Sequence, residues 1–461
     1  MGTRRRGGFT QSDNTGIPER GNLSGALIIQ AVMHTPLLVS LLLAVQTPAP
    51  LDSAEVARVL AQLKVSDSTV CELAGQALTN YGWLWRGGRD YSIVGMPMPR
   101  PMPTPMPMPG GGGGMGIMHD VMHGDKEHRS GIDAAMLGAF RAVLRDDNRC
   151  VRNIAARVIG NHGGAGTYDV FLALLRDTKP ALRETGAIGL GELEDSRAIG
   201  PLSDALNDAD LAVRVRAVWA LGEIEETAAI DPLTRALKDR APEVRRAAAW
   251  ALGQIENVRG VRPLGDALND QALDVRLTAA WALGEIEDDM AVPLLATAAK
   301  DREPKVRQAA AWALGEIESS QGVGPLTPLV RDPVLEVRKA AIWALGEIEA
   351  GSGVNAVAVG LKDDDSDVRV LAAWALGEIE DASGVEPLVA ALKDPDIDVR
   401  VAAAWALGEI ESPLALDALR TAQQDASGAV RRAASWALRQ IDDEDDPRVR
   451  VRVRPRVKIK S

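Results

Sequence analysis

The sequence predicts an all-α protein, an α-solenoid of about eleven two-helix repeats with a 31-residue period. One observation is a tryptophan that recurs at this step, and another is a Val-Arg pair that keeps the same step, as in Val399-Arg400. Because two short helices cannot bury their apolar faces alone, consecutive units must stack on one another. The tryptophans are Trp219, Trp250, Trp281, Trp312, Trp343, Trp374, Trp405 and Trp436.

Each unit is expected to contain two helices joined by a turn. In the unit that ends at Glu411, Pro387 fits the first turn of one helix, and the turn Asp394-Pro395-Asp396 ends that helix. The second helix is predicted over 398–410, with an apolar stripe of alanine and leucine at helical spacing. Gly408 recurs in the other units at a helical position where glycine costs about 1 kcal/mol relative to alanine. We therefore expect it to form a packing notch.

These residues carry a resemblance to a known family. The string VRVAAAWALGEIE, preceded by the turn KDPDID, resembles the HEAT-like repeats of the phycobilisome-lyase type over residues 132–446. The resemblance implies a right-handed superhelix whose second helices line the concave surface. It implies less about function, because the family includes bilin lyases, a metal-dependent hydroxylase and many interaction proteins. Those hydroxylases use His-Glu pairs within their helices, and this sequence contains no His-Glu dipeptide.

Other segments flank the regular array. Residues 1–49 form a leader with an apolar run at 37–45, LLVSLLLAV, which is typical of a signal peptide and predicts export to the periplasm or cell envelope. A cytoplasmic location is the alternative. Residues 50–83 are interpreted as a degenerate first repeat, 84–131 as a flexible insertion rich in Met, Pro and Gly, and 447–461 as a basic tail.

Composition excludes several classes of protein. With two cysteines, the chain is neither a disulfide-dense scaffold nor a zinc module that needs four thiolates. A net charge of −12 argues against nucleic acid as the main partner. Cys71 and Cys150 are expected on opposing flanks of helices in neighbouring repeats, so a disulfide in an oxidising compartment and two free thiols are both open.

The tryptophans have two interpretations. On a helical wheel, Trp405 lies on one flank of the second helix and Arg400 lies on the other. Tryptophan and arginine from successive repeats would then form cation–π pairs that hold the stack together. Alternatively, the tryptophan edges form an exposed aromatic ribbon that binds a partner.

A row of glutamates is predicted beside the tryptophans, near the ends of the second helices: Glu192, Glu223, Glu285, Glu316, Glu347, Glu378 and Glu409. The row is interpreted either as a solvated acidic face or as a concave groove that attracts basic peptides. No pair differs from its repeats in the way that a catalytic acid and base would. We therefore predict no catalytic residue and no cofactor.

Histidine and methionine gather in the insertion, at His119, His123, His128, Met115, Met118 and Met122. Thioether and imidazole groups suit Cu(I), so this segment is interpreted as a soft-metal site or, alternatively, as a low-complexity linker.

The last fifteen residues, PRVRVRVRPRVKIKS, carry seven basic side chains, which leaves a net charge of −19 for residues 1–446. This tail is expected to dock on the acidic groove of its own or a neighbouring chain, to lie on an anionic surface, or to fray. The sequence as a whole predicts an exported, non-enzymatic scaffold that binds a protein or basic peptide. The alternatives are an enzyme related to the bilin lyases and a protein that captures Cu(I).

Overall fold

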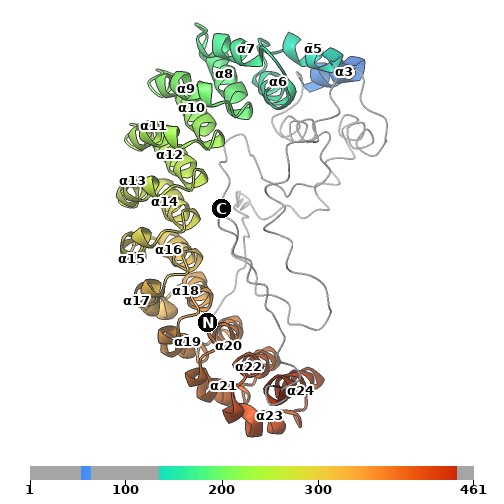
Figure 1. Cartoon of the computed structure of the whole chain (residues 1–461), viewed down its shortest axis with the longest axis vertical. Coiled ribbons are helices and arrows are strands. Elements are labelled where there is room, and N and C mark those ends of the chain that lie inside the picture. The colour runs from blue at the N-terminus through green and yellow to red at the C-terminus, as the bar shows by residue number, and fades with distance from the viewer. Residues whose placement is uncertain (1–52, 64–133, 444–461) are drawn as a thin grey trace, which may run out of the picture.

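The computed structural model describes residues 53–63 and 134–443, and these residues form an arc of paired helices without a β-strand (Figure 1). The second helix of each repeat lies on the concave side of the arc, and the first helix lies on the convex side. This arrangement is the all-α solenoid that the repeat predicts. No helix in these two ranges is long and apolar enough to cross a membrane.

The convex layer contains the first helices of the repeats. They are α5 (Ala134–Ala142), α7 (Thr167–Leu175), α9 (Ile199–Ala205), α11 (Ile230–Ala236), α13 (Val261–Ala267), α15 (Val292–Ala298), α17 (Val323–Leu326), α19 (Val354–Gly360), α21 (Val385–Ala391) and α23 (Leu416–Ala422). From α9 onward a short 3-10 turn precedes each helix, as η4 (Asp289–Ala291) precedes α15. An additional helix, α3 (Ser53–Leu63), packs against α5 and α6 and belongs to the segment interpreted as a degenerate first repeat.

The concave layer contains the second helices. They are α6 (Arg149–His162), α8 (Pro180–Glu192), α10 (Leu211–Glu223), α12 (Pro242–Gln254), α14 (Leu273–Glu285), α16 (Pro304–Glu316), α18 (Leu335–Glu347), α20 (Ser366–Ile379), α22 (Ile397–Glu409) and α24 (Gly428–Asp443). The turn residues set where these helices begin. Asp210, for example, accepts hydrogen bonds from the N–H groups of Ala212 and Val213, and Pro242 occupies a first-turn position.

One repeat departs from the pattern because of a proline. Helix α17 ends after one turn and continues as a 3-10 segment, η6 (Thr327–Arg331), which contains Pro328. Since proline has no N–H and its ring clashes with the preceding turn, an α-helix cannot run through this position without distortion.

The recurring glycine is a packing notch, as predicted, and the structure shows what fills it. A Cβ atom built on Gly315 would lie 2.8 Å from Cζ3 of Trp343 and 3.0 Å from Cα of Ala344 in the next repeat. In the last described repeat the corresponding position holds Arg439. Glycine is therefore present where the tryptophan of the following repeat must be accommodated.

Replacing Gly315 with alanine is expected to lower the free energy of unfolding by about 1–3 kcal/mol, because a rigid indole and a backbone atom would have to move. Chemical denaturation measures this difference. Gly200→Ala is the matched control, since a Cβ there would meet nothing within 4 Å. The control is expected to be neutral or slightly stabilising. Equal effects of the two substitutions would contradict the notch.

Candidate functional site: the concave face

An arginine–aspartate ladder connects successive repeats. The Arg245 guanidinium donates through Nε to Oδ2 of Asp270 at 2.6 Å and through Nη2 to Oδ1 at 2.8 Å. Its Nη1 donates to the carbonyl oxygen of Asp239 at 2.9 Å, in the turn of its own repeat. The same ion pair recurs at Arg183–Asp208, Arg214–Asp239, Arg276–Asp301, Arg307–Asp332, Arg338–Asp363, Arg369–Asp394 and Arg400–Asp425. These paired hydrogen bonds fix the register of neighbouring turns.

The ladder corrects an expectation from the sequence. In one of the two interpretations of the tryptophans, the arginines of the Val-Arg pairs stack on the indole rings, but in the structure their guanidinium groups bind the aspartates instead. Within the described residues, the cation–π contact of a tryptophan is that of Arg157 with Trp219, at 5.8 Å from the ring centroid. A carboxylate offers arginine a charge-assisted, bidentate contact, which is stronger than a cation–π contact at a partly exposed site.

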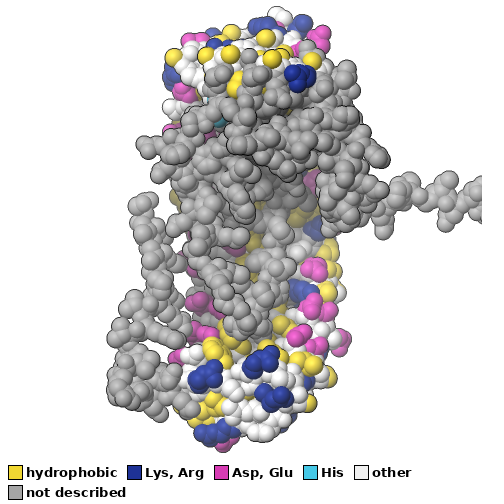
Figure 2. Space-filling model, turned by 90° about the vertical axis from the view of Figure 1, so that its right-hand side faces the viewer, with side chains coloured by type: hydrophobic (Ala, Val, Ile, Leu, Met, Phe, Trp, Pro, Cys, Tyr) yellow, Lys and Arg dark blue, Asp and Glu magenta, His cyan; other side chains and the backbone are white. Residues whose placement is uncertain are grey.

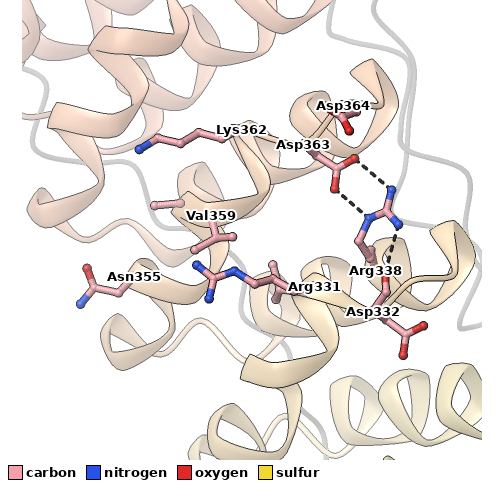
Figure 3. Close-up of a pocket in the computed structure, with 10 residues that line it drawn as sticks. Arg331, Asp332, Arg338, Asn355, Val359, Lys362, Asp363 and Asp364 are labelled. Atoms are coloured by element: carbon pink, nitrogen blue, oxygen red, sulfur yellow. Dashed lines mark hydrogen bonds and ion pairs between the residues drawn. The ribbon is translucent and has the colours of Figure 1, made fainter.

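A hollow of about 620 Å³ lies beside the ladder, lined by residues of η6, α19 and the turn that follows each of them (Figure 3). Arg331 and Lys362 extend along it, near Asn355 and Val359. Of its other charged residues, Asp363 is paired with Arg338 and Asp332 with Arg307. The lining contains no histidine or cysteine. The carboxylates of Asp332 and Asp363 form ion pairs that connect neighbouring repeats.

The tryptophans are mostly buried between repeats. Trp219, Trp250, Trp281, Trp312 and Trp343 expose 9% or less of their surface, whereas Trp374, Trp405 and Trp436 are half-buried. Their Cζ3 edges fit the glycine notches of the preceding repeats. The first five tryptophans thus pack as structural residues, and an accessible aromatic surface is confined to the last three.

Two of these tryptophans carry buried donors without an acceptor. The indole Nε1 atoms of Trp250 and Trp281 are buried and make no hydrogen bond. In each ring this N–H lies on the edge opposite Cζ3, and Cζ3 of Trp281 packs on Gly253. Buried N–H groups usually have a partner, so an acceptor within reach of either Nε1 would be stabilised.

The predicted glutamate row lies at the ends of the concave helices, and its side chains are half-buried. We call Glu285, Glu316, Glu347, Glu378 and Glu409 the first carboxylate row. It is unbroken from α14 to α22, and in α12 the corresponding residue is Gln254. Glu192 in α8 and Glu223 in α10 occupy the equivalent position in their repeats.

A second carboxylate row lies two residues further along each chain segment, and the sequence reasoning missed it. Its members have left-handed backbone conformations, with φ between +48° and +53°. They are Glu194, Glu225, Glu256, Glu287, Glu318, Glu349, Glu380 and Glu411. This conformation costs a residue with a Cβ roughly 1–2 kcal/mol, and glycine or asparagine usually occupies it. The repeated string GEIE was the available signal, since its second glutamate follows the last helical turn.

Burial and like charge act together on the first row. Desolvation raises the pKa of Glu347 to about 7, and the neighbouring carboxylates of Glu378 and Glu316 add to the effect. Desolvation also raises the pKa of Glu192, although Arg157 lies at 3.6 Å and the Asn161 amide donates a hydrogen bond of 2.8 Å. The Glu347 carboxylate therefore lies in a place where a cation would be stabilised.

The raised pKa of Glu347 predicts a pH dependence of stability. Between pH 4.5 and about 7 the folded protein keeps a proton that the unfolded chain has lost, so this group's contribution to stability falls as the pH rises. Glu347→Gln is expected to stabilise the protein by about 1 kcal/mol at pH 8, after allowance for solvent screening, and to change little at pH 4.5. Denaturation at both pH values measures this. Glu336→Gln, exposed on the same helix, is the control, and equal pH dependence in both variants would contradict the assignment.

The concave face has a different character at its N-terminal end. Glu184 is buried and pairs with Arg149 at 2.5 Å and with Arg216 at 3.6 Å, while Arg157 pairs with Glu192. Carboxylates there are matched by arginines of neighbouring repeats. On the concave side, acidic side chains are visible along the middle of the array, and Lys and Arg gather at the end formed by the last repeats (Figure 2). Arg431, Arg432 and Arg439 of α24 lie at that end.

Comparison with known proteins identifies the family. A family model described as HEAT repeats matches residues 138–211, 199–274, 261–346, 325–391 and 354–439. The chain belongs to the HEAT-repeat family. The resemblance of this HEAT-repeat protein to the phycobilisome-lyase type stays a prediction from the sequence. No curated protein matches the chain.

Solved structures that are similar to this HEAT-repeat protein span several contexts. An engineered protein is 24% identical, with 66% of this chain and 98% of that chain covered and a TM-score of 0.41. Human deoxyhypusine hydroxylase in complex with glycerol is 26% identical, with coverages of 55% and 99% and a TM-score of 0.26. A structure of Kap95p and RanGDP is 12% identical, with coverages of 94% and 60% and a TM-score of 0.50. This last likeness shows the fold alone.

Several predicted site residues lie outside the described residues. They include His119, His123, His128, Met115, Met118, Met122 and Cys71. Cys150 is half-buried in the first turn of α6 and is disulfide-bonded, and because its partner lies outside the described residues, the pairing with Cys71 stays a prediction. Within residues 53–63 and 134–443, no group of His, Cys, Asp or Glu has the arrangement of a metal site.

Proposed function

We propose that this HEAT-repeat protein is a non-enzymatic scaffold that binds an extended, basic protein segment along α14–α22. Stacked helical repeats present long concave surfaces, and such surfaces suit extended partners. Two parallel rows of carboxylates follow this surface from one repeat to the next. A segment with basic side chains at regular intervals matches that charge pattern.

The observation that carries the proposal is the second carboxylate row. Eight glutamates occupy a backbone conformation that disfavours them, in eight successive repeats. Local stability would be better served by glycine at each position. Strained residues are concentrated at functional sites, and the shared feature here is a carboxylate. The raised pKa of Glu347 supports the same conclusion, because a bound cation would relieve the burial and repulsion that cause it.

An apolar strip lies next to the rows in α20 and α22. Val370 and Val401 are half-buried, as are Trp374 and Trp405. On the helical wheel they precede the first-row glutamates by about 40–80°, so one side of a bound segment would contact apolar groups. The proposed partner is therefore a segment in which basic and apolar residues alternate.

A peptide-binding experiment tests the proposal. The probe is a fluorescent peptide of alternating arginine and valine, and the protein is the full chain with the seven basic residues of 447–461 changed to glutamine. The triple variant Glu316→Gln, Glu347→Gln, Glu378→Gln is expected to weaken binding at least tenfold at 0.1 M salt. Affinity should also fall steeply as the salt concentration rises.

The control triple variant removes carboxylates from the convex layer, through Asp204→Asn, Asp266→Asn and Glu386→Gln. These side chains are exposed on α9, α13 and α21. The control is expected to bind as the parent does. Equal weakening by both triple variants would show a general effect of net charge and would contradict a specific concave site.

The remaining functional predictions rest on the sequence alone. The Met/His insertion lies outside the described residues, so Cu(I) capture stays a prediction from the sequence, as does bilin-lyase activity. We also propose that the protein is exported. Sequencing of the mature N-terminus tests this, because a start upstream of Leu37 would contradict cleavage after the apolar run.

A further inference from the structure

The basic segment 447–461 is separated from the end of α24 by three residues in the sequence. It follows α24, which ends at Asp443, and every concave helix ends at the edge that carries the rows. We propose that residues 447–461 of the same chain occupy the carboxylate rows of α14–α22. This inference rests on the proposed function and names the first occupant of that surface.

The length of the segment matches the unbroken part of the first row. Eighteen residues, 444–461, span at most about 60 Å when fully extended. Neighbouring helices pack about 8–10 Å apart, so the five steps from α24 to α14 cover roughly 50 Å. The segment can therefore reach Glu285 but not far beyond it. The first row is continuous from Glu285 to Glu409, and its first interruption, Gln254, lies in the next helix.

The charges also match. Five glutamates of the first row and five of the second lie between α14 and α22. In an extended segment, successive side chains point to opposite sides. One side of the tail would then carry its basic residues toward the carboxylates, and the other would carry valine, proline and isoleucine, part of which meets the apolar strip of α20 and α22. The basic residues are Arg448, Arg450, Arg452, Arg454, Arg456, Lys458 and Lys460.

Trp281, in α14 at the far end of the proposed surface, carries a buried donor, as does Trp250 in α12 beyond it. The side chain of Trp281 is more than nine-tenths buried, and its Nε1 has no hydrogen-bond partner. Tryptophan is a donor only, so the group that satisfies it must be an acceptor. An extended segment that reaches α14 presents unpaired backbone carbonyl oxygens, which are acceptors of this kind.

Docking within one chain would make partner binding competitive. A tethered segment acts at an effective concentration in the millimolar range when its tether spans the site. A free basic segment must therefore displace residues 447–461 before it binds. The surface is then selective for partners that bind the rows more tightly than the tail does.

The test compares two forms of the full chain. One is the natural sequence, and the other has the seven basic residues of 447–461 changed to glutamine. The probe is a fluorescent peptide with the sequence of residues 447–461, and light scattering after size exclusion gives the mass of each form. We expect the neutralised chain to bind the probe at least tenfold more tightly at 0.15 M salt, with both forms monomeric. A variant with Arg235→Gln, Arg262→Gln and Arg302→Gln removes three positive charges outside the tail, against seven in the neutralised chain, and should bind as the natural chain does.

Each alternative outcome has a distinct meaning. If both forms bind the probe equally tightly, the tail does not occupy the rows, and this inference fails while the proposed function stands. If neither form binds the probe, the proposed function fails as well. If the natural chain is a dimer that dissociates when the tail is neutralised, the tail docks on a second copy, and the intramolecular assignment is overturned.

Discussion

Replacing Trp343 with alanine is expected to lower the free energy of unfolding by about 3–5 kcal/mol. The indole is 9% exposed, and its Cζ3 edge lies against the glycine notch at Gly315 in the preceding repeat. Its removal leaves a cavity between two repeats, and neither glycine nor the flanking alanines can fill it. Chemical denaturation followed by circular dichroism measures the loss.

The control for Trp343 is Leu414→Ala, which truncates a side chain that is 76% exposed and is expected to change stability by less than about 0.5 kcal/mol. A loss below 1 kcal/mol in Trp343→Ala would contradict a structural role. The double variant with Gly315→Ala adds a further check. Because the cavity removes the clash, the two effects should not add.

Replacing Arg245 with alanine is expected to cost about 2–4 kcal/mol, because the half-buried Asp270 carboxylate would lose a bidentate partner. The Asp239 carbonyl would also lose a hydrogen bond. Thermal and chemical denaturation at pH 7 measure the cost. Arg240→Ala removes an exposed arginine from the adjacent turn, and its stability should stay within about 0.5 kcal/mol of the parent. Equal losses in the two variants would contradict the ladder.

The same ion pair predicts sensitivity to acid. The Arg245 hydrogen bond lowers the pKa of Asp270 below its ordinary value, against the opposing effect of burial. Stability from this pair is therefore present above about pH 4, the pKa of an unperturbed aspartate, and is lost as the pH falls through the lowered value. Arg245→Ala lacks this contribution, so the difference in free energy of unfolding between the variant and the parent should become smaller in strong acid. A difference that stays constant down to pH 2 would contradict the assignment.

The fold could be predicted from the sequence because a repeat of fixed length constrains every unit in the same way. The glycine notch followed from the cost of glycine inside a helix, as at Gly408. The partner of Arg400 could not be predicted, since a helical wheel gives direction around one helix and not the identity of a residue in the next repeat. The turn residue Asp394 was interpreted as a helix breaker. Its carboxylate also accepts hydrogen bonds from the Arg369 guanidinium.

The candidate site was predictable only in part. Glu347 and its equivalents lie at helical spacing, so a wheel places them on one side. Glu349 and its equivalents lie beyond the last turn, where helical spacing no longer applies and the backbone turns left-handed. The exposed fraction of each tryptophan also could not be predicted from the sequence, because it depends on how closely successive repeats approach each other. Trp250 is 1% exposed although its wheel position lies outside the apolar stripe.

The central claim is that the carboxylate rows of α14–α22 form the binding surface. Zero-length coupling of carboxylates to amines, with a bound peptide of alternating lysine and valine, tests this most directly. The protein is the full chain with a neutralised tail, and mass spectrometry identifies the coupled residues. The account predicts coupling to Glu285, Glu316, Glu347, Glu378, Glu409 and their second-row neighbours. Coupling confined to convex carboxylates such as Asp266 and Glu386 would contradict it.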